Sequence, residues 1–249
     1  MTDSKACDFL IEQLAAYGIE ISDEQASLIV RHIHLVIEKN KVTNLTRITS
    51  LEDALVLHDI DSLLLVRPIK ELLSSKESVA SFVDIGTGAG FPGVPLGIVT
   101  GHDGVLIDSV QKKTDAVNEF IRDLCLEGTL AARHVRAEEL GLEEPRNFDY
   151  AVARAVARLD VLMEYATPLL RDKGFFIATK AILSDEETSA CDIAAELCGL
   201  ESVSRETLEL PQEAGHREIL VYKKTDESKI KLPRRSGMAT KRPLGDRKK

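Results

Sequence analysis

The sequence predicts an α/β fold with a mostly parallel sheet, helices on both faces and a helical N-terminal extension. Three observations support this prediction. From residue 81 onward, short segments rich in β-branched and aromatic residues alternate with helical segments. The first of these strands runs directly into a glycine-rich loop, and the chain before it has helical patterns only. Alternation of this kind is typical of a parallel sheet covered by helices.

Two helices are predicted in the first 41 residues. Apolar residues recur there at helical spacing, for example at Ile29 and Ile33, and Gly18 interrupts the pattern. Ser22 or Asp23 is expected to cap the second helix, because a side-chain oxygen at that position accepts a hydrogen bond from the first turn. These helices form the start of the N-terminal extension.

A third helical segment is predicted before the first strand. Residues 50–69 are rich in apolar side chains, and Pro68 is expected to end the helix because proline removes a backbone donor. Residues 70–78 are predicted to form a polar connection. The predicted organisation is a helical extension packed on the core, a main α/β domain and a basic C-terminal tail, at residues 1–70, 79–224 and 225–249.

Seven strands are predicted in the main domain. They cover residues 81–86, 104–108, 131–136, 148–153, 174–180, 203–210 and 217–224. Helices are predicted to begin near Pro92, Ser109, Glu138, Ala157 and Ser184. The last two strands have no clear helix between them, so we expect a hairpin that places one antiparallel strand in the sheet. In such a sheet, ligands bind at the carboxyl ends of the strands.

The charge distribution of the chain is uneven. The whole chain has a net charge of −9, which by itself disfavours a nucleic-acid partner. From Lys223 to the last residue, however, there are 11 Lys or Arg and 3 Asp or Glu. The tail could therefore bind a polyanion, although a solvated terminus without a partner is equally compatible with the charge.

Several functional classes are disfavoured by composition. No apolar run reaches the roughly 18 residues that a membrane helix needs, and the N-terminus has no secretory pattern. The four cysteines form no C-x-x-C pair and fit reduced thiols in the cytosol. We expect a cytoplasmic monomer that has neither a membrane nor a metal partner.

The loop after the first strand allows two interpretations. Gly88, Gly90 and Gly93 match the dinucleotide fingerprint G-x-G-x-x-G, and an acidic residue, Asp108, follows about 20 positions later. A single match of this kind is weak, because the pattern is short. The loop therefore fits either the pyrophosphate of a nicotinamide cofactor or the nucleoside of a sulfonium methyl donor.

Three features favour the methyl donor. Asp84 lies inside the end of the strand, two residues before Gly86, and the tightest glycine spacing is G-x-G-x-G. The predicted terminal hairpin also leaves no room for a second nucleotide-binding half. These features resemble the glycine loop of Rossmann-like S-adenosylmethionine-dependent methyltransferases. We therefore interpret Asp84, Gly86 and Gly88 as donor-binding residues.

Residues after the next strands complete the expected donor site. Asp108 follows the second strand and could accept hydrogen bonds from both ribose hydroxyls, or it could only cap the next helix. The backbone amides of Ala137 and Glu138 follow the third strand and could bind the adenine edge. Their alternative role is to start a helix with surface charges. Asp84 would favour the positive charges of the donor.

The segment after the fourth strand restricts the target atom. Enzymes that methylate exocyclic amino groups often have [N/D]-P-P-[aromatic] there, whereas this chain has AVARAVA at residues 151–157. None of the four cysteines lies at a strand end, as a cytosine-C5 enzyme requires. A ring nitrogen with a free lone pair, such as guanine N7, needs neither device. The enzyme must mainly align it about 3 Å from the methyl group.

Several segments in order resemble one family. They are NLTRITSLEDALVLHDIDSL, DIGTGAGFPGVPLGI, LIDSVQKKTDAVNEF, RAEEL, FDYAVARAVARLDVLMEYATPLL and GFFIATK, and the tail segment KLPRRSGMATKRPL is similar as well. Over roughly residues 40–245 the chain resembles the RsmG family, the bacterial guanine-N7 methyltransferases of 16S rRNA once named glucose-inhibited division protein B. The resemblance implies S-adenosylmethionine as the donor and a guanine in the decoding-region loop of the small ribosomal subunit as the target.

The resemblance also implies roles for individual residues. The family's donor-binding positions fall on Gly86, Phe91, Ala137, Glu138 and Arg154. Arg154 would contact the donor carboxylate or the RNA, although an isolated arginine is more often a surface residue. Lys180 would approach the target base or a phosphate, and a solvated lysine is equally compatible. We interpret Arg154 and Lys180 as the candidate catalytic residues.

Two further positions match the family on the helix before the sheet. His58 and Asp61 fit a family motif there, and we expect them to form a structural hydrogen-bonded pair that closes the site. Leu57, Ala181 and Ala239 differ from residues common in the family. Two rival functions are a nicotinamide-dependent oxidoreductase and an RNA-binding assembly factor that has lost catalysis.

Overall fold

The computed structural model describes residues 1–154 and 157–246 of the chain. Contacts between residues divide the described chain into two units. The first unit contains Met1–Ala80, Thr87–His134 and Glu209–Gly215, and the second contains Ser81–Gly86, Val135–Leu208 and the chain from His216 onward.

The seven predicted strands form one sheet. Its strand order is β3-β2-β1-β4-β5-β7-β6. The strands are β1 (Ser81–Ile85), β2 (Asp103–Asp108), β3 (Leu130–His134), β4 (Phe148–Arg154), β5 (Leu170–Lys180), β6 (Leu200–Glu209) and β7 (His216–Lys224). The pairs β2–β3, β1–β4 and β4–β5 are parallel, whereas β7 runs antiparallel to β5. The predicted fold class, with one antiparallel strand from the last pair, is therefore confirmed.

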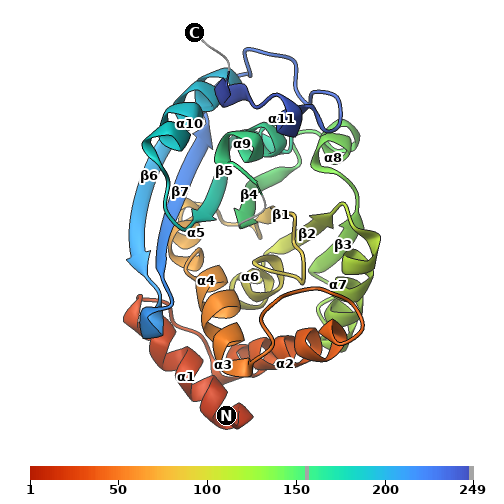
Figure 1. Ribbon diagram of the computed structural model, residues 1–249, viewed down its shortest axis with the longest axis vertical. Coiled ribbons are helices and arrows are strands. Elements are labelled where there is room, and N and C mark those ends of the chain that lie inside the picture. Colours follow the sequence, from red (N-terminus) through yellow and green to blue (C-terminus); the bar gives the residue numbers. More distant parts are fainter. Residues whose placement is uncertain (155–156, 247–249) are drawn as a thin grey trace. The chain divides into compact units, whose positions relative to one another are not determined.

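The first unit combines helices with β2 and β3 (Figure 1). Its longer helices are α1 (Asp3–Ala16), α2 (Asp23–Asn40), α6 (Gly93–Thr100) and α7 (Gln111–Asp123). Ser22 caps α2, because its hydroxyl accepts from the Gln25 N–H while the Gln25 side chain accepts from the Ser22 N–H. The Gln25 amide also donates to the carbonyls of Ile98 and Val99 in α6. This side chain connects the start of α2 to the end of α6.

The helix predicted at residues 50–69 is a series of shorter segments. They are α3 (Leu51–Ala54), a π-helical segment (Leu55–Ile60), α4 (Asp61–Leu63) and α5 (Val66–Leu72). The prediction that Pro68 ends the helix is wrong, because Pro68 is the third residue of α5. In the first turn of a helix the backbone N–H has no intrahelical acceptor, so proline is tolerated there. Because Pro68 does not end the helix, residues 70–72, which were predicted as part of a polar connection, are helical.

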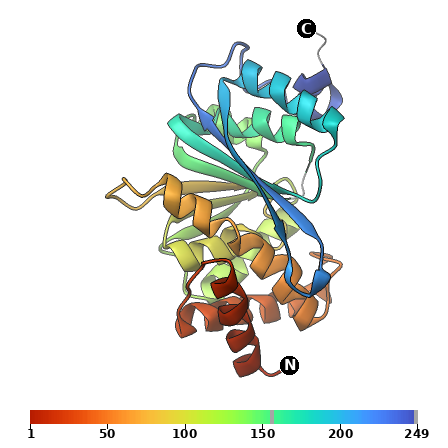
Figure 2. The same ribbon diagram turned by 90° about the vertical axis from the view of Figure 1, so that its left-hand side faces the viewer.

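The second unit contains β1 and β4–β7, with helices α8 (Ala137–Glu143), α9 (Leu159–Ala166), α10 (Asp185–Cys198) and α11 (Met238–Lys241). Figure 2 shows β6 and β7 as two long strands that run side by side. Ser184 caps α10 by accepting from the Glu187 N–H, as the sequence predicted for the start of this helix. The core includes Phe82 and Tyr150, whose rings stack at 5.3 Å between centroids.

The end of the described chain is folded. After β7, the chain forms α11 and a short 3-10 turn, Leu244–Asp246, next to α9 and α10 (Figure 1). Ala239 and Leu244 are fully buried there. A solvated terminus, one of the two sequence interpretations of the tail, therefore does not describe these residues.

Candidate functional site

The glycine loop of the first unit has a backbone that other residues adopt with difficulty. Gly88 and Gly90 have φ angles of +61° and +97°. A Cβ atom on Gly90 would lie 2.9 Å from Val94 Cγ2 and 3.1 Å from His32 Nε2. The N–H groups of Gly90 and Phe91 both donate to the Thr87 carbonyl at 2.9 Å, which closes the loop. The loop is therefore a tight turn packed closely on α2.

Asp108 connects this loop to the start of α7. Its buried carboxylate accepts from the Gly88 N–H at 3.1 Å and from the Val110 N–H at 2.9 Å. Lys113 Nζ lies 3.5 Å from Oδ2. The Val110 contact stabilises the turn before α7 but does not cap the helix, because Val110 is itself the N-cap residue and α7 has no side-chain cap. This contact and ribose binding are compatible, because an ionised carboxylate has about four acceptor positions.

The Phe91 ring packs between two imidazole rings. Its centroid lies 4.6 Å from that of His58, in a stacked arrangement, and 4.8 Å from that of His32. Only 4% of Phe91 is exposed, so the ring is packed against protein groups. His58 Nε2 is also 2.8 Å from Thr46 Oγ1, and Asp61 is buried in α4. His58 thus supports the loop by stacking on Phe91. The sequence interpretation expected His58 to pair with Asp61 and did not include a contact with Phe91.

His32 is a residue that the sequence interpretation missed. It lies on the buried face of α2, against Gly90, Phe91 and Phe120. Complete burial lowers the pKa of His32 to about 3, because the charged form loses its hydration. The ring is therefore neutral over the physiological pH range. Its position one residue before Ile33, on the apolar stripe of the predicted helix, was the available signal.

In the second unit, the register of three parallel strands places three predicted residues near one another along the sheet. Asp84 of β1 is opposite Val152 of β4, two residues before Arg154. Arg154 is opposite Thr179 of β5, the neighbour of Lys180. Asp84 is fully buried, and Gly86 follows β1 with a φ angle of +79°. The carboxyl ends of β1, β4 and β5 thus carry the charged side chains that the sequence predicted there.

Lys180 is held by its neighbours. Its ammonium group lies 2.9 Å from Glu187 Oε1 in α10 and donates to the Ala157 carbonyl at 3.2 Å. The side chain therefore bridges the end of β5 and the first turn of α10. A contact with a base or a phosphate would compete with the Glu187 ion pair.

Ala137 and Glu138 are the first two residues of α8, as the sequence predicted for a helix start. The N–H groups in the first turn of a helix have no intrahelical acceptor, so they can bind a ligand edge. Only 5% of Glu138 is exposed, and its Oε1 accepts from the Gly237 N–H at 2.9 Å. No local pattern indicated this contact, which joins residues 99 positions apart.

The structure thus distributes the predicted residues over both units. Gly88, Phe91 and Asp108 are in the first unit. The second unit contains Asp84, Gly86, Ala137, Glu138, Arg154 and Lys180. Asp84 is the penultimate residue of β1, and each of the others follows or ends one of the strands β1–β5, where the topology of an α/β sheet predicts ligand binding.

The family comparison identifies the chain. The model of the family described as rRNA small subunit methyltransferase G (GidB) matches residues 25–219. The chain belongs to this family. The predicted family relationship is confirmed, and the protein is an rRNA methyltransferase by its family.

Relatives match over almost the whole chain. The ribosomal RNA small subunit methyltransferase G of an Exiguobacterium species is 40% identical over 238 residues, which cover 94% of this chain and 97% of the relative. The protein of the same name from Bacillus pumilus is 36% identical over 241 residues, which cover 94% of this chain and 98% of the relative.

Solved structures agree on the fold. The Burkholderia thailandensis 1,6-didemethyltoxoflavin-N1-methyltransferase was crystallised with 1,6-didemethyltoxoflavin and S-adenosylhomocysteine, and the similarity covers 84% of this chain and 92% of that chain. It has a TM-score of 0.51 and 13% identity. A geranyl diphosphate methyltransferase in complex with S-adenosylmethionine has a TM-score of 0.50 and 12% identity, and covers 65% of this chain and 86% of its own. At these identities the similarity supports the Rossmann-like methyltransferase fold alone.

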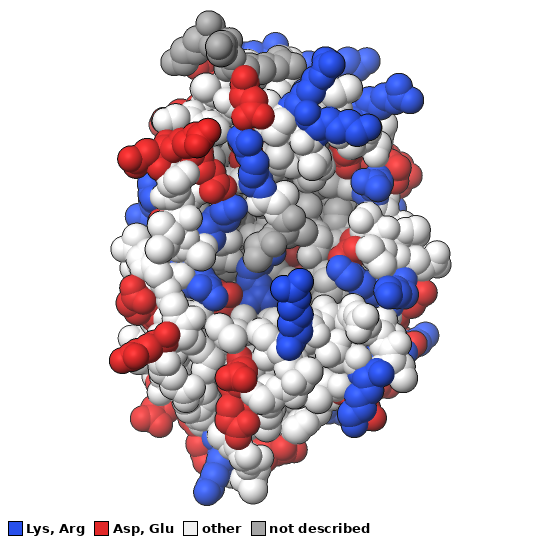
Figure 3. Space-filling view, viewed as in Figure 1, with Lys and Arg blue, Asp and Glu red and all other residues white. Residues whose placement is uncertain are grey.

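Basic residues of this methyltransferase gather on the surface of the second unit. Figure 3 shows Lys and Arg side chains over the C-terminal segment around α11. The exposed basic residues of this segment are Lys231, Arg235, Lys241 and Arg242. Other basic residues of the tail are used within the protein. For example, Lys224 is buried and donates to the carbonyls of Thr167 and Leu170.

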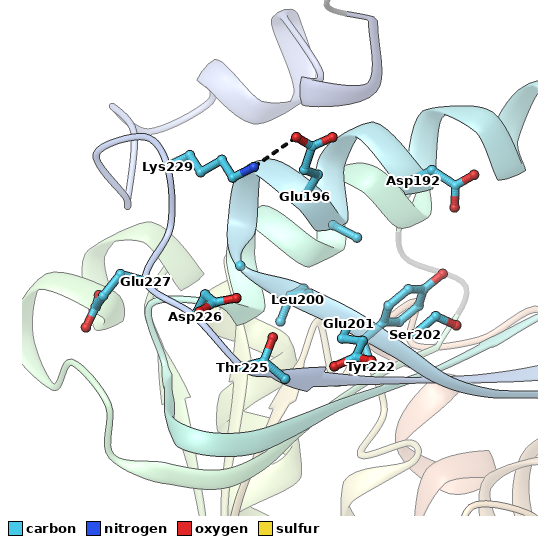
Figure 4. A pocket seen from close by; sticks show the side chains of 12 residues that line it. Asp192, Glu196, Leu200, Glu201, Ser202, Tyr222, Thr225, Asp226, Glu227 and Lys229 are labelled. Carbon is cyan, nitrogen blue, oxygen red and sulfur yellow. Dashed lines mark hydrogen bonds and ion pairs between the residues drawn. The ribbon is translucent and has the colours of Figure 1, made fainter.

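A cavity of about 490 Å³ lies elsewhere in the second unit, between the end of α10 and strands β6 and β7 (Figure 4). Its lining includes the carboxylates of Asp192, Glu196, Glu201, Asp226 and Glu227. Lys229 forms an ion pair with Glu196 at 2.9 Å. None of the predicted site residues lines this cavity, and its negative charge would repel RNA phosphates.

The described residues contain no group of three or more His, Cys, Asp or Glu side chains that could hold a metal ion. Within the same residues, the helices are too short or too polar to span a membrane. All four cysteines of the chain are free thiols.

Proposed function

We propose that this methyltransferase transfers a methyl group from S-adenosylmethionine to N7 of one guanine in the 16S rRNA of the small ribosomal subunit. The observation that carries the proposal is the family match over residues 25–219, together with a relative that is 40% identical over 94% of the chain. The fold supports the donor, because the Burkholderia enzyme of the same fold was crystallised with S-adenosylhomocysteine. Activity on ribosomal RNA would place the protein in the cytoplasm.

The residues of the first unit fit the nucleoside of the donor. S-adenosylmethionine supplies a methyl group activated on a sulfonium and offers a ribose diol but no phosphate. Asp108 would accept hydrogen bonds from the two ribose hydroxyls, while its existing bond to the Gly88 N–H holds the carboxylate in place. The absence of a side chain at Gly88 and its positive φ allow the backbone to approach a ligand closely.

The residues of the second unit fit the remaining groups. The buried carboxylate of Asp84 would stabilise the positive charges of the bound donor by electrostatic attraction. Gly86, directly after β1, has no side chain and would let the donor approach the backbone. The N–H groups of Ala137 and Glu138 would bind the adenine edge. Arg154 would contact the donor carboxylate or the RNA. Phe91 of the first unit would also contact the donor.

Guanine N7 suits a site without a general base. N7 already has a lone pair in the base plane, so no proton must leave before it attacks the methyl group. The main task of the enzyme is to hold N7 and the methyl group in line, which can account for a large part of the rate enhancement. Lys180 would approach the base or a neighbouring phosphate. The exposed basic residues near α11 would attract the RNA backbone, so binding should weaken as salt rises.

A methyl-transfer assay tests this function. Labelled S-adenosylmethionine is incubated with the protein and with small subunits or naked rRNA from a strain that lacks the gene, and the modified nucleoside is identified by mass spectrometry. The expected product is N7-methylguanosine at one position. Another modified nucleoside would contradict the target, and no transfer to either substrate would favour a binding role. Binding of a nicotinamide cofactor instead of S-adenosylhomocysteine would favour the oxidoreductase alternative.

A further inference from the structure

The C-terminal segment, residues 233–246, is attached along its length to α8 and α9 of the second unit. Figure 1 shows α11 of this segment close to both helices. Hydrogen bonds join the segment to α8, to α9 and to Arg158, the residue before α9. The pairs are Arg234–Glu164, Gly237–Glu138, Thr240–Tyr165, Gly245–Asp160 and Asp246–Arg158. A chain end held at so many points is a fixed structural element.

Arg234 is the strongest of these attachments. Its guanidinium donates from Nε to Glu164 Oε1 at 2.7 Å and from Nη2 to Glu164 Oε2. Nη2 also donates to the Arg242 carbonyl at 2.9 Å, so one side chain connects the C-terminal end of α11 to α9. Glu164 is 1% exposed and the Arg234 side chain 13%. Removing one partner of a buried ion pair is costly, because the other charge is left unpaired.

Gly237 brings the same segment to α8. Its N–H donates to Glu138 Oε1 at 2.9 Å, and its φ of +75° turns the chain into α11. Pro233 is near the same helix, because a Cβ atom on Gly141 would lie 3.7 Å from Pro233 Cγ. The C-terminal segment therefore fixes the carboxylate of the second residue of α8 and packs against a later residue of that helix.

We propose that the C-terminal segment is a positioning element of the donor site, with Arg234 holding the segment and Gly237 holding Glu138. This inference rests on the proposed role of Ala137 and Glu138 in binding the donor. The segment touches no donor atom in this scheme. It sets the orientation of the first turn of α8, whose N–H groups bind the adenine edge. Donor affinity should then depend on Arg234, a basic residue that charge alone would assign to RNA.

Two neighbouring arginines provide a matched test. Arg234 is buried in its ion pair, whereas Arg235 is exposed, so Arg234→Ala and Arg235→Ala remove the same charge from adjacent positions. Binding of S-adenosylhomocysteine and of rRNA is measured by titration for both variants. Arg234→Ala should raise the Kd for S-adenosylhomocysteine by about five- to tenfold, and Arg235→Ala should leave it unchanged. With saturating donor, the kcat of Arg234→Ala should stay within about twofold of wild type.

Hydrogen exchange on the wild-type protein provides a second readout, which does not depend on the folding of a variant. Addition of S-adenosylhomocysteine should slow amide exchange at residues 137–140 and also at residues 236–241. A purely structural segment, or one that only contacts RNA, would show no donor-dependent change at residues 236–241.

The outcomes separate this inference from the proposed function. If wild type binds S-adenosylhomocysteine but residues 236–241 show no change in exchange, the positioning role is overturned. Equal donor affinity in folded Arg234→Ala and Arg235→Ala would overturn it as well, and the proposed function would stand in both cases. If the wild-type protein does not bind S-adenosylhomocysteine, the proposed function and this inference both fail.

Discussion

Asp108 accepts a hydrogen bond from the backbone N–H of Gly88, so the end of β2 fixes the glycine loop. The same carboxylate accepts from the Val110 N–H at the start of α7. One side chain therefore holds the two segments between which the ribose of a methyl donor would bind. Asp108 therefore has a role in the local backbone beside the role in donor binding that we propose.

Asp108→Ala should weaken binding of S-adenosylhomocysteine by about 10- to 100-fold, because hydrogen bonds to a charged group contribute about 1.5–3 kcal/mol. Asp115→Ala is the matched control, since Asp115 is an exposed carboxylate on α7. Calorimetric titration measures both affinities. If Asp108→Ala lowers thermal stability but binds the ligand with wild-type affinity, Asp108 only stabilises the turn.

His32 should make the stability of the protein depend on pH. Burial lowers its pKa to about 3, whereas the unfolded chain has a His pKa near 6.5. Between these values the unfolded state binds a proton that the folded state does not, so stability is complete above about pH 6.5 and falls as the pH is lowered. From pH 7 to pH 5, this group should reduce the free energy of unfolding by about 2 kcal/mol.

Urea unfolding of wild type and His32→Gln at the two pH values tests this prediction. The variant should lose about 2 kcal/mol less than wild type over the same pH interval. His34→Gln, at an exposed position of the same helix, should behave like wild type. An identical pH dependence in wild type and His32→Gln would contradict the assigned role of burial.

Gly90→Ala should destabilise the protein through two causes, an unfavourable positive φ and a contact of 2.9 Å with Val94. Gly101→Ala serves as the control, because Gly101 also has a positive φ of +67° but open space around its Cβ position. Each variant should lose about 1 kcal/mol from the backbone, and Gly90→Ala about 1–3 kcal/mol more from overpacking. Equal free energies of unfolding for the two variants would show that the loop relieves the contact with Val94 without cost.

Lys180→Met should lower kcat for methyl transfer by about tenfold or more if Lys180 approaches the target base. Glu187→Gln removes the partner of Lys180 from α10 and leaves the lysine in place. We expect Glu187→Gln to keep kcat within about twofold of wild type, because the ammonium group is then free to meet the RNA. If Lys180→Met and Glu187→Gln have equal kcat values and equal losses of stability, Lys180 serves only to connect β5 with α10.

Replacing the exposed basic residues near α11, Lys231, Arg235, Lys241 and Arg242, by alanine should weaken rRNA binding with little effect on donor binding. Each lost phosphate contact should reduce the slope of log Kd against log salt by about 0.7–0.9. Filter binding over a salt series measures this slope. An unchanged slope would place the RNA contacts on another surface.

The elements of the sheet could be predicted from the sequence because their signals are local. Runs such as Phe148–Ala153 are largely apolar and bounded by polar segments, and the glycines at 86, 88 and 90 mark the loop after the first strand, where all three have positive φ. The interruption of the helix at residues 50–69 was not predictable in this way. A long apolar stretch gives no indication of where a π-helical segment or a turn will occur.

The site was predictable to the extent that topology defines it. Residues at strand ends, such as Asp108 and Arg154, were identified from their place after a strand. The contacts between distant segments were not, because Arg234 and Glu164 are 70 residues apart and no local pattern connects them. For the same reason, the tail was interpreted from its charge, while several of its basic groups are used inside the protein.

Helix α2 supports the glycine-loop region at two points, through Gln25 at the end of α6 and through His32 at Gly90 and Phe91. The residues expected to touch the donor all come much later in the chain. A shortened protein beginning at the first strand would keep every one of those residues and lose the support beneath the loop. A catalytic fragment of this enzyme should therefore need α2 together with its cap at Ser22.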